Sequence, residues 1–128
     1  KIEPELEEAY IAACQIEEGL AREMSAGKTG RELYQLSEAA GADLGYKDYL
    51  GGPPGGKCGF VGHGVGLELD EYPVIGPLDH ELQSNMTIAI EPKIIYPDKG
   101  VLGIEDTFLT SSGAAESLTH MPREIWQV

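Results

Sequence analysis

The residues with the most evident chemical potential are one histidine and two glutamates in the second half of the chain. His63 lies in the glycine-rich run Gly62–Gly66, and Glu91 and Glu105 lie inside two apolar segments that are typical of strands. The flanking glycines leave the imidazole unobstructed, and an imidazole with carboxylates suits Zn, Mn, Fe or Co rather than Ca. The residues alone leave two alternatives open: a simple loop histidine, and glutamates on a solvated sheet face.

Two strands are predicted to carry these glutamates, over Met86–Tyr96 and Val101–Thr110. Because side chains alternate between the two faces of a strand, Glu91 and Glu105 each share a face with small residues, which leave space around the carboxylates. A carboxylate buried in such an apolar strand is unfavourable unless it is paired or bound to a metal. The same alternation directs Asp106 to the opposite face, where a backbone or basic partner is expected.

Two helices are predicted ahead of these strands. Apolar residues recur at three- and four-residue steps through the first 26 residues, as in an amphipathic helix. Thr29 and Glu32 have the spacing of a capping box, in which each side chain binds the other residue's backbone amide. The second helix is therefore predicted to begin there and to end at Gly41 or Gly45.

The segments between the helices and strands are rich in glycine and proline. Residues 45–59 are expected to form a loop, because their Gly-Gly-Pro-Pro-Gly-Gly run fits neither a helix nor a central strand. Gly59–Leu69 is typical of a strand, Tyr72–Asn85 of a long turn-rich connection, and Pro97–Gly100 of a hairpin loop. Helices that precede strands predict an α+β fold, with the two helices packed on one face of a mainly antiparallel sheet.

The overall composition narrows the classes of partner. Nine Lys and Arg residues against 22 Asp and Glu residues give a net charge of −13, which disfavours nucleic acid and anionic membranes as ligands. The sequence contains no run of 18 apolar residues, so a membrane span is not expected. Cys14 and Cys58 are too few for a disulfide framework, which favours a reducing, cytoplasmic setting.

Four short motifs together resemble the family of methionine aminopeptidase, aminopeptidase P and prolidase, and most closely its Xaa-Pro dipeptidase branch. The motifs are, in order, Gly62–Gly66, Asp70–Pro73, Ile90–Pro92 and Gly103–Thr107. The resemblance covers nearly the whole chain and implies the pita-bread fold of that family. It also implies that residues 1–128 form a single partial domain, the C-terminal half of a catalytic domain. A chain that starts in helical sequence without a methionine agrees with this expectation.

The resemblance implies a role for each matching residue. His63, Glu91 and Glu105 match metal ligands of the family's site for two divalent ions (Mn, Co, Zn or Fe), with Glu105 bridging both ions and Glu91 also a general base. Asp70 occupies the position of a family histidine that holds the substrate, so it is a candidate catalytic and substrate-binding residue, and Gly64 is a candidate substrate-binding residue. The family's two aspartate ligands have no match here, so the metal site is expected to be incomplete.

By the same resemblance, the parent protein is expected to hydrolyse an N-terminal residue or an Xaa-Pro dipeptide by metal-bound hydroxide, and this chain alone to be inactive. Its expected partners are a peptide substrate, the missing N-terminal half of the domain, and a second copy in a homodimer, because half a sheet exposes its edges. One alternative is a non-catalytic pita-bread module that binds peptides or proteins, which Asp70 in place of the histidine favours. Another is a related hydrolase that acts on a C–N bond of a small molecule.

Overall fold

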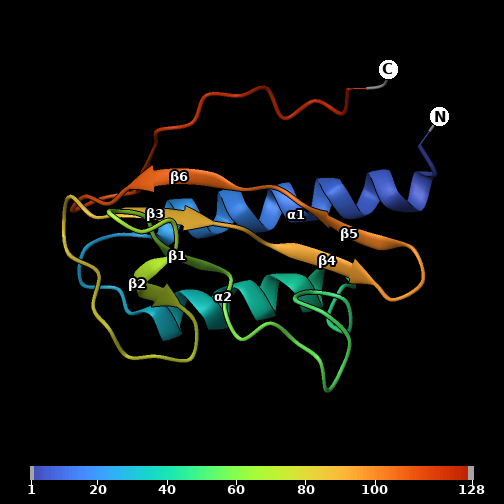
Figure 1. The fold of residues 1–128 in the computed structure, drawn as a ribbon, viewed down its shortest axis with the longest axis horizontal. Coiled ribbons are helices and arrows are strands. Elements are labelled where there is room, and N and C mark those ends of the chain that lie inside the picture. Colours follow the sequence, from blue (N-terminus) through green and yellow to red (C-terminus); the bar gives the residue numbers. More distant parts are fainter. Residues whose placement is uncertain (1, 127–128) are drawn as a thin grey trace.

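The fold consists of two helices followed by a series of short strands (Figure 1). The computed structural model describes residues 2–126. The helices are α1 (Pro4–Glu23) and α2 (Gly30–Asp43). The strands are β1 (Gly62–Gly64), β2 (Glu71–Ile75), β3 (Thr87–Ile90), β4 (Lys93–Tyr96), β5 (Gly100–Gly103), β6 (Asp106–Leu109) and β7 (Glu116–Ser117). Within residues 2–126, neither helix is long and apolar enough to cross a bilayer.

Both helices form where the apolar periodicity and the caps predict them. α1 begins with Pro4 in its first turn, where a missing N–H is tolerated, and it ends at Glu23, three residues earlier than predicted. The predicted capping box of α2 is present: the Thr29 amide donates to the Glu32 carboxylate, and the Glu32 amide donates to the Thr29 hydroxyl. Gly45 has a φ of +87° just after the last turn of α2, a backbone conformation that favours glycine at a helix end.

The strands form one five-stranded sheet and one separate hairpin. The sheet has the order β2-β1-β3-β6-β7, and each neighbouring pair is antiparallel. β4 and β5 form the hairpin around the predicted turn. α1 and α2 lie side by side against one face of this arrangement (Figure 1). The predicted α+β fold, with two helices on a mainly antiparallel sheet, is confirmed.

The predicted strands over Met86–Tyr96 and Val101–Thr110 are wrong in their continuity, because each is two shorter strands. The first breaks before Pro92, which cannot donate an N–H to a central ladder. The second breaks at Ile104 and Glu105, so that β5 pairs with β4 and β6 pairs with β3. The two breaks occur at equivalent positions along the pairing, and the chain passes there from the five-stranded sheet into the hairpin.

The predicted connection over Tyr72–Asn85 is also partly wrong, because most of β2 lies within it. β2 is an edge strand beside β1. An edge strand tolerates Pro73, since the residues on its outer side need no N–H donor. The alternation of apolar and polar residues is weak in this segment, which explains why the sequence pattern indicated a turn-rich connection.

The core lies between the helices and one face of the sheet. Ile88, Ile90 and Phe108 are buried there together with apolar residues of both helices. Side chains alternate along β3 and β6. The small side chain of Ala89 and its cross-strand neighbour Thr107 therefore point to the face away from the helices. The sheet therefore has one face covered by helices and a second face on which polar side chains can gather.

Candidate metal centre

Strand pairing brings the three predicted metal ligands to one place. His63 of β1 pairs with Ala89 of β3, which in turn pairs with Thr107 of β6. Glu91 follows Ala89 by two residues and Glu105 precedes Thr107 by two, so the antiparallel arrangement places the two glutamates opposite each other. All three side chains therefore belong to the sheet face away from the helices.

These three side chains are close enough to share bound ions. Nε2 of His63 lies 3.8 Å from Oε1 of Glu91 and 3.7 Å from Oε1 of Glu105, and ligand atoms of the three residues all lie within 4.8 Å of one another. The two distances from His63 exceed hydrogen-bond lengths, whereas two ligands that each bind one ion at about 2.1 Å can be up to about 4.2 Å apart. The donor types and their spacing therefore fit a divalent transition metal.

The surroundings of His63 determine which ring nitrogen faces the glutamates. The His63 side chain is only 6% exposed, and its Nδ1 lies 3.1 Å from the carbonyl oxygen of Gly64. Because a carbonyl oxygen only accepts hydrogen bonds, Nδ1 carries the proton and Nε2 presents its lone pair to the glutamates. Asp70 is largely exposed and lies on the Nδ1 side, with Oδ1 3.8 Å away. Asp70 thus borders the site from the side of the ring that the glutamates do not occupy.

The glycines beside His63 allow a close approach between strands. A Cβ on Gly64 would lie 2.4 Å from the carbonyl oxygen of Tyr72, and a Cβ on Gly62 would lie 2.5 Å from that of Ala89. Both distances are too short for a side chain, so β1 can fit between β2 and β3 only with glycine at these positions. The substrate-binding role expected of Gly64 stays a prediction.

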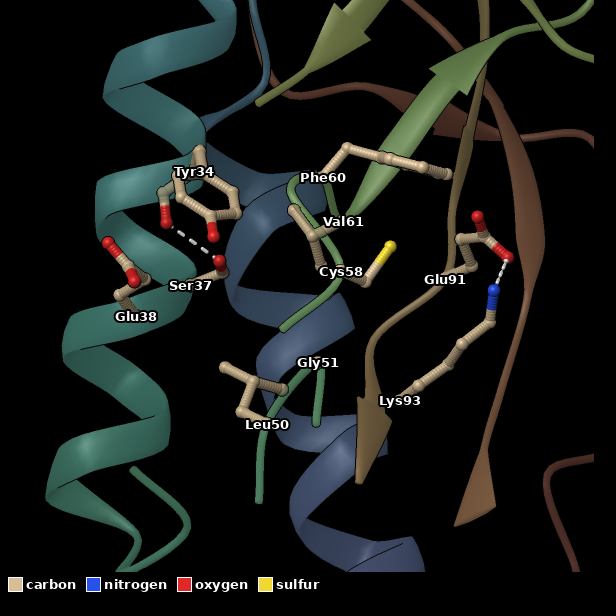
Figure 2. Close-up of a pocket in the computed structure, with 10 residues that line it drawn as sticks. All are labelled: Tyr34, Ser37, Glu38, Leu50, Gly51, Cys58, Phe60, Val61, Glu91 and Lys93. Atoms are coloured by element: carbon tan, nitrogen blue, oxygen red, sulfur yellow. Dashed lines mark hydrogen bonds and ion pairs between the residues drawn. The ribbon is translucent and has the colours of Figure 1, made fainter. Parts of the chain in front are cut away.

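Glu91 has a further partner, Lys93, which the sequence reasoning missed. Nζ of Lys93 lies 2.5 Å from Oε2 of Glu91, whose side chain is only 10% exposed (Figure 2). Partial burial lowers the pKa of Lys93, but the hydrogen bond and the charge of Glu91 raise that pKa by more, so the net shift is upward. Both residues line a cavity together with Cys58 and Phe60 (Figure 2). The available signal was their two-residue spacing, which places both side chains on one side of an extended chain.

On the opposite face of the sheet, Asp106 has the basic partner that alternation predicted. Nη2 of Arg123 lies 2.8 Å from Asp106 and 2.6 Å from Glu17 of α1, and Nη1 lies 3.2 Å from Glu18. Glu17 is fully buried, and its contact with Arg123 is poorly aligned for a hydrogen bond. Arg123 therefore compensates two buried carboxylates and connects the C-terminal segment to α1 and β6.

The buried carboxyl of Glu17 is expected to make stability depend on pH. Burial raises the pKa of Glu17 to about 7 from an ordinary value of 4.5; the charge of Arg123 opposes this shift and that of Asp106 adds to it. Because the folded state binds this proton more tightly, the stabilisation is complete below pH 4.5 and is lost as the pH rises through about 7. The loss amounts to about 3 kcal/mol. Urea denaturation gives the free energy of unfolding of Glu17→Gln and of the unmodified chain at each pH between 5 and 8. The loss is the amount by which the gap between these two free energies changes over that range.

The same measurement on Glu18→Gln serves as the control, because Glu18 is a neighbouring carboxylate that is about half exposed. Its unfolding free energy should follow that of the unmodified chain across this pH range. Parallel curves for Glu17→Gln and the unmodified chain would show that the buried carboxyl does not titrate as described.

Comparison with known proteins agrees with this arrangement of ligands. The sequence model of metallopeptidase family M24 matches residues 1–112. The chain belongs to metallopeptidase family M24. Membership confirms the resemblance drawn from the four motifs. The family is one of metallopeptidases, and the grouping of His63, Glu91 and Glu105 fits a metal-dependent family.

The M24 chain is similar to curated Xaa-Pro dipeptidases. It is 38% identical over 100 residues to the Xaa-Pro dipeptidase of Pyrococcus furiosus, which covers 77% of the chain and 27% of that enzyme. It is 32% identical over 119 residues to the Xaa-Pro dipeptidase of Pyrococcus horikoshii, which covers 92% of the chain and 32% of that enzyme. The M24 chain therefore spans about a third or less of the length of these relatives.

Solved structures show the same architecture as the M24 chain. The X-Pro aminopeptidase of Thermotoga maritima superposes with a TM-score of 0.89 at 27% identity, over 100% of the chain and 35% of that protein. The prolidase of Pyrococcus horikoshii superposes with a TM-score of 0.83 at 30% identity, over 97% of the chain and 34% of that protein. The predicted pita-bread architecture is thus confirmed.

Proposed function

We propose that this chain supplies part of the divalent-metal centre of a peptidase that removes an N-terminal residue or splits an Xaa-Pro dipeptide. The observation that carries the proposal is the convergence of His63, Glu91 and Glu105 on one sheet face. Family membership and the similarity to Xaa-Pro dipeptidases support this class of reaction. Because the chain spans about a third of those relatives, we propose that it forms the C-terminal part of a longer catalytic domain, whose other part completes the site.

Each residue of the site has a proposed task. His63, Glu91 and Glu105 would hold divalent ions, which when bound supply Lewis acidity toward a peptide carbonyl and toward water. The Glu91 carboxylate would also accept a proton from the attacking water and pass it to the leaving amine. Asp70 at the border of the site and Gly64 beside His63 would contact the peptide substrate.

The direct test is whether the chain binds a divalent ion through these residues. Titration of the 128-residue chain with Co²⁺, followed by calorimetry and visible absorption, is expected to show binding that His63→Ala abolishes. Glu105→Gln is expected to weaken binding by about tenfold or more, because it removes a charged ligand from the set. His120→Ala is the control, since His120 is an exposed histidine in the C-terminal segment.

Co²⁺ binding that persists unchanged in His63→Ala would contradict the proposed site. Absence of Co²⁺ binding in the unmodified chain would favour the second candidate function, a non-catalytic module that binds peptides. The feature in favour of that candidate is Asp70, a carboxylate at the position where the family carries a histidine.

A further inference from the structure

We infer that Lys93 sets how tightly this site holds a divalent ion, because it occupies one oxygen of Glu91 and adds a positive charge beside the ligands. The inference rests on the proposed metal site and deepens it by assigning a role to a residue outside the three ligands. Lys93 is thus a positioning residue that acts through Glu91.

The two carboxylate oxygens of Glu91 have different partners. Oε1 lies 3.8 Å from Nε2 of His63, whereas Oε2 lies 2.5 Å from Nζ of Lys93. The second contact is a close ion pair between the ammonium and the carboxylate. Because the Glu91 side chain is only 10% exposed, water competes little for these oxygens. Glu91 therefore offers a single oxygen to an ion for as long as Lys93 keeps the other.

Lys93 also changes the net charge that an incoming cation meets. Glu91 and Glu105 contribute two negative charges, and Asp70 adds a third at the border of the site. The ammonium of Lys93 cancels one of these charges and repels a dication directly. Even at the dielectric constant of water, a unit positive charge in contact with one of the ligands lowers the affinity for a dication by about tenfold.

The ammonium of Lys93 can be removed with little disturbance of packing. Its side chain is 39% exposed, so methionine can keep the apolar stem in place while the charge is lost. Lys99 provides a matched control, because its side chain is 42% exposed and also pairs with carboxylates, those of Glu3 and Glu5 near the start of α1. The two lysines differ in that only Lys93 contacts a proposed metal ligand.

The experiment compares the dissociation constants for Co²⁺ of the unmodified chain, Lys93→Met, Lys93→Arg and Lys99→Met, measured by calorimetry at pH 7. Lys93→Met is expected to bind Co²⁺ about tenfold more tightly than the unmodified chain, because a repelling charge is removed and Oε2 of Glu91 is released. Lys93→Arg keeps the charge and should stay within about threefold of the unmodified chain. Lys99→Met should leave the constant unchanged.

A second measurement reports on the Lys93–Glu91 pair without depending on affinity. Carbodiimide treatment of the metal-free chain should join the two side chains in an amide, detected by mass spectrometry as the loss of one water molecule from the peptide that contains both. Co²⁺ should suppress this coupling, because a carboxylate bound to the ion is a poorer nucleophile toward the carbodiimide. A coupling product that is absent, or that forms equally with Co²⁺ present, overturns the inference.

The failure of this inference is distinguishable from the failure of the proposed function. Unchanged or weaker Co²⁺ binding in Lys93→Met, with binding in the unmodified chain that His63→Ala abolishes, overturns only the role of Lys93. Absence of Co²⁺ binding in the unmodified chain overturns both.

Discussion

Replacing Arg123 with methionine is expected to lower the free energy of unfolding by about 3–5 kcal/mol. Arg123 is the basic group between fully buried Glu17 and nearly buried Asp106, with side-chain contacts of 2.6 and 2.8 Å. Without it, two carboxylates remain in the protein interior with no cation between them, and burying an uncompensated charge is unfavourable. Urea denaturation at pH 8, where Glu17 is charged, measures the loss.

Arg22→Met is the matched control, because Arg22 pairs with exposed Glu18 at 3.9 Å and its own side chain is 68% exposed. A solvated pair of this kind contributes little to stability, so no resolvable change is expected. An effect of Arg123→Met as small as that of Arg22→Met would mean that Glu17 and Asp106 find compensation elsewhere.

Gly62→Ala is expected to lower the free energy of unfolding by about 3 kcal/mol and to weaken Co²⁺ binding with it. The added methyl group would lie 2.5 Å from the carbonyl oxygen of Ala89 and 3.2 Å from Cγ1 of Ile75. The first neighbour is backbone of a central strand and cannot rotate away, so β1 must shift. A shift of β1 moves His63, the next residue, away from the glutamates. Urea denaturation and a Co²⁺ titration check the two effects.

Gly59→Ala controls for the change of residue type, because a Cβ at Gly59 meets no atom within 4 Å in the described structure. Its unfolding free energy and its affinity for Co²⁺ should match those of the unmodified chain. If Gly62→Ala behaved like Gly59→Ala, the close contact between β1 and β3 would not be what requires glycine before His63.

The helices could be predicted from sequence because their signals are local. The spacing of apolar residues predicts α1, and the reciprocal bonds of Thr29 and Glu32 involve residues only three apart. The strand breaks depend instead on tertiary pairing. Ile90 and Lys93 lie three residues apart, yet Ile90 pairs with Asp106 in the five-stranded sheet and Lys93 pairs with Gly103 in the hairpin. An apolar run contains no information about which partner strand each part selects.

The candidate site was partly accessible from sequence. Alternation was enough to place each glutamate beside small residues on its own strand and to place Asp106 opposite Glu105, because a strand has a period of two regardless of its partner. The pairing of β3 with β6 is what brings the two glutamates to one face of the sheet. The ion pair of Lys93 with Glu91 and the ion pairs of Arg123 were less accessible, because the sequence predicted a basic partner for Asp106 without identifying it and gave only a two-residue spacing for Lys93. Lys93 lies beyond a strand break, and Arg123 reaches Glu17 across 106 positions of sequence, a separation that only the fold can close.

Glu105 and Asp106 are adjacent in the chain, yet one faces the proposed ions and the other faces Arg123. The face to which each carboxylate points is set by the alternation of side chains along the strand, so that neighbouring residues point to opposite faces. The gain or loss of one residue at this point would exchange the two and would disrupt the ligand set and the buried ion pair together. Insertions and deletions are therefore expected to be disfavoured in this segment, whereas the exposed tip of the glycine-rich loop, residues 54–57, is a place where a change in length is expected to be tolerated.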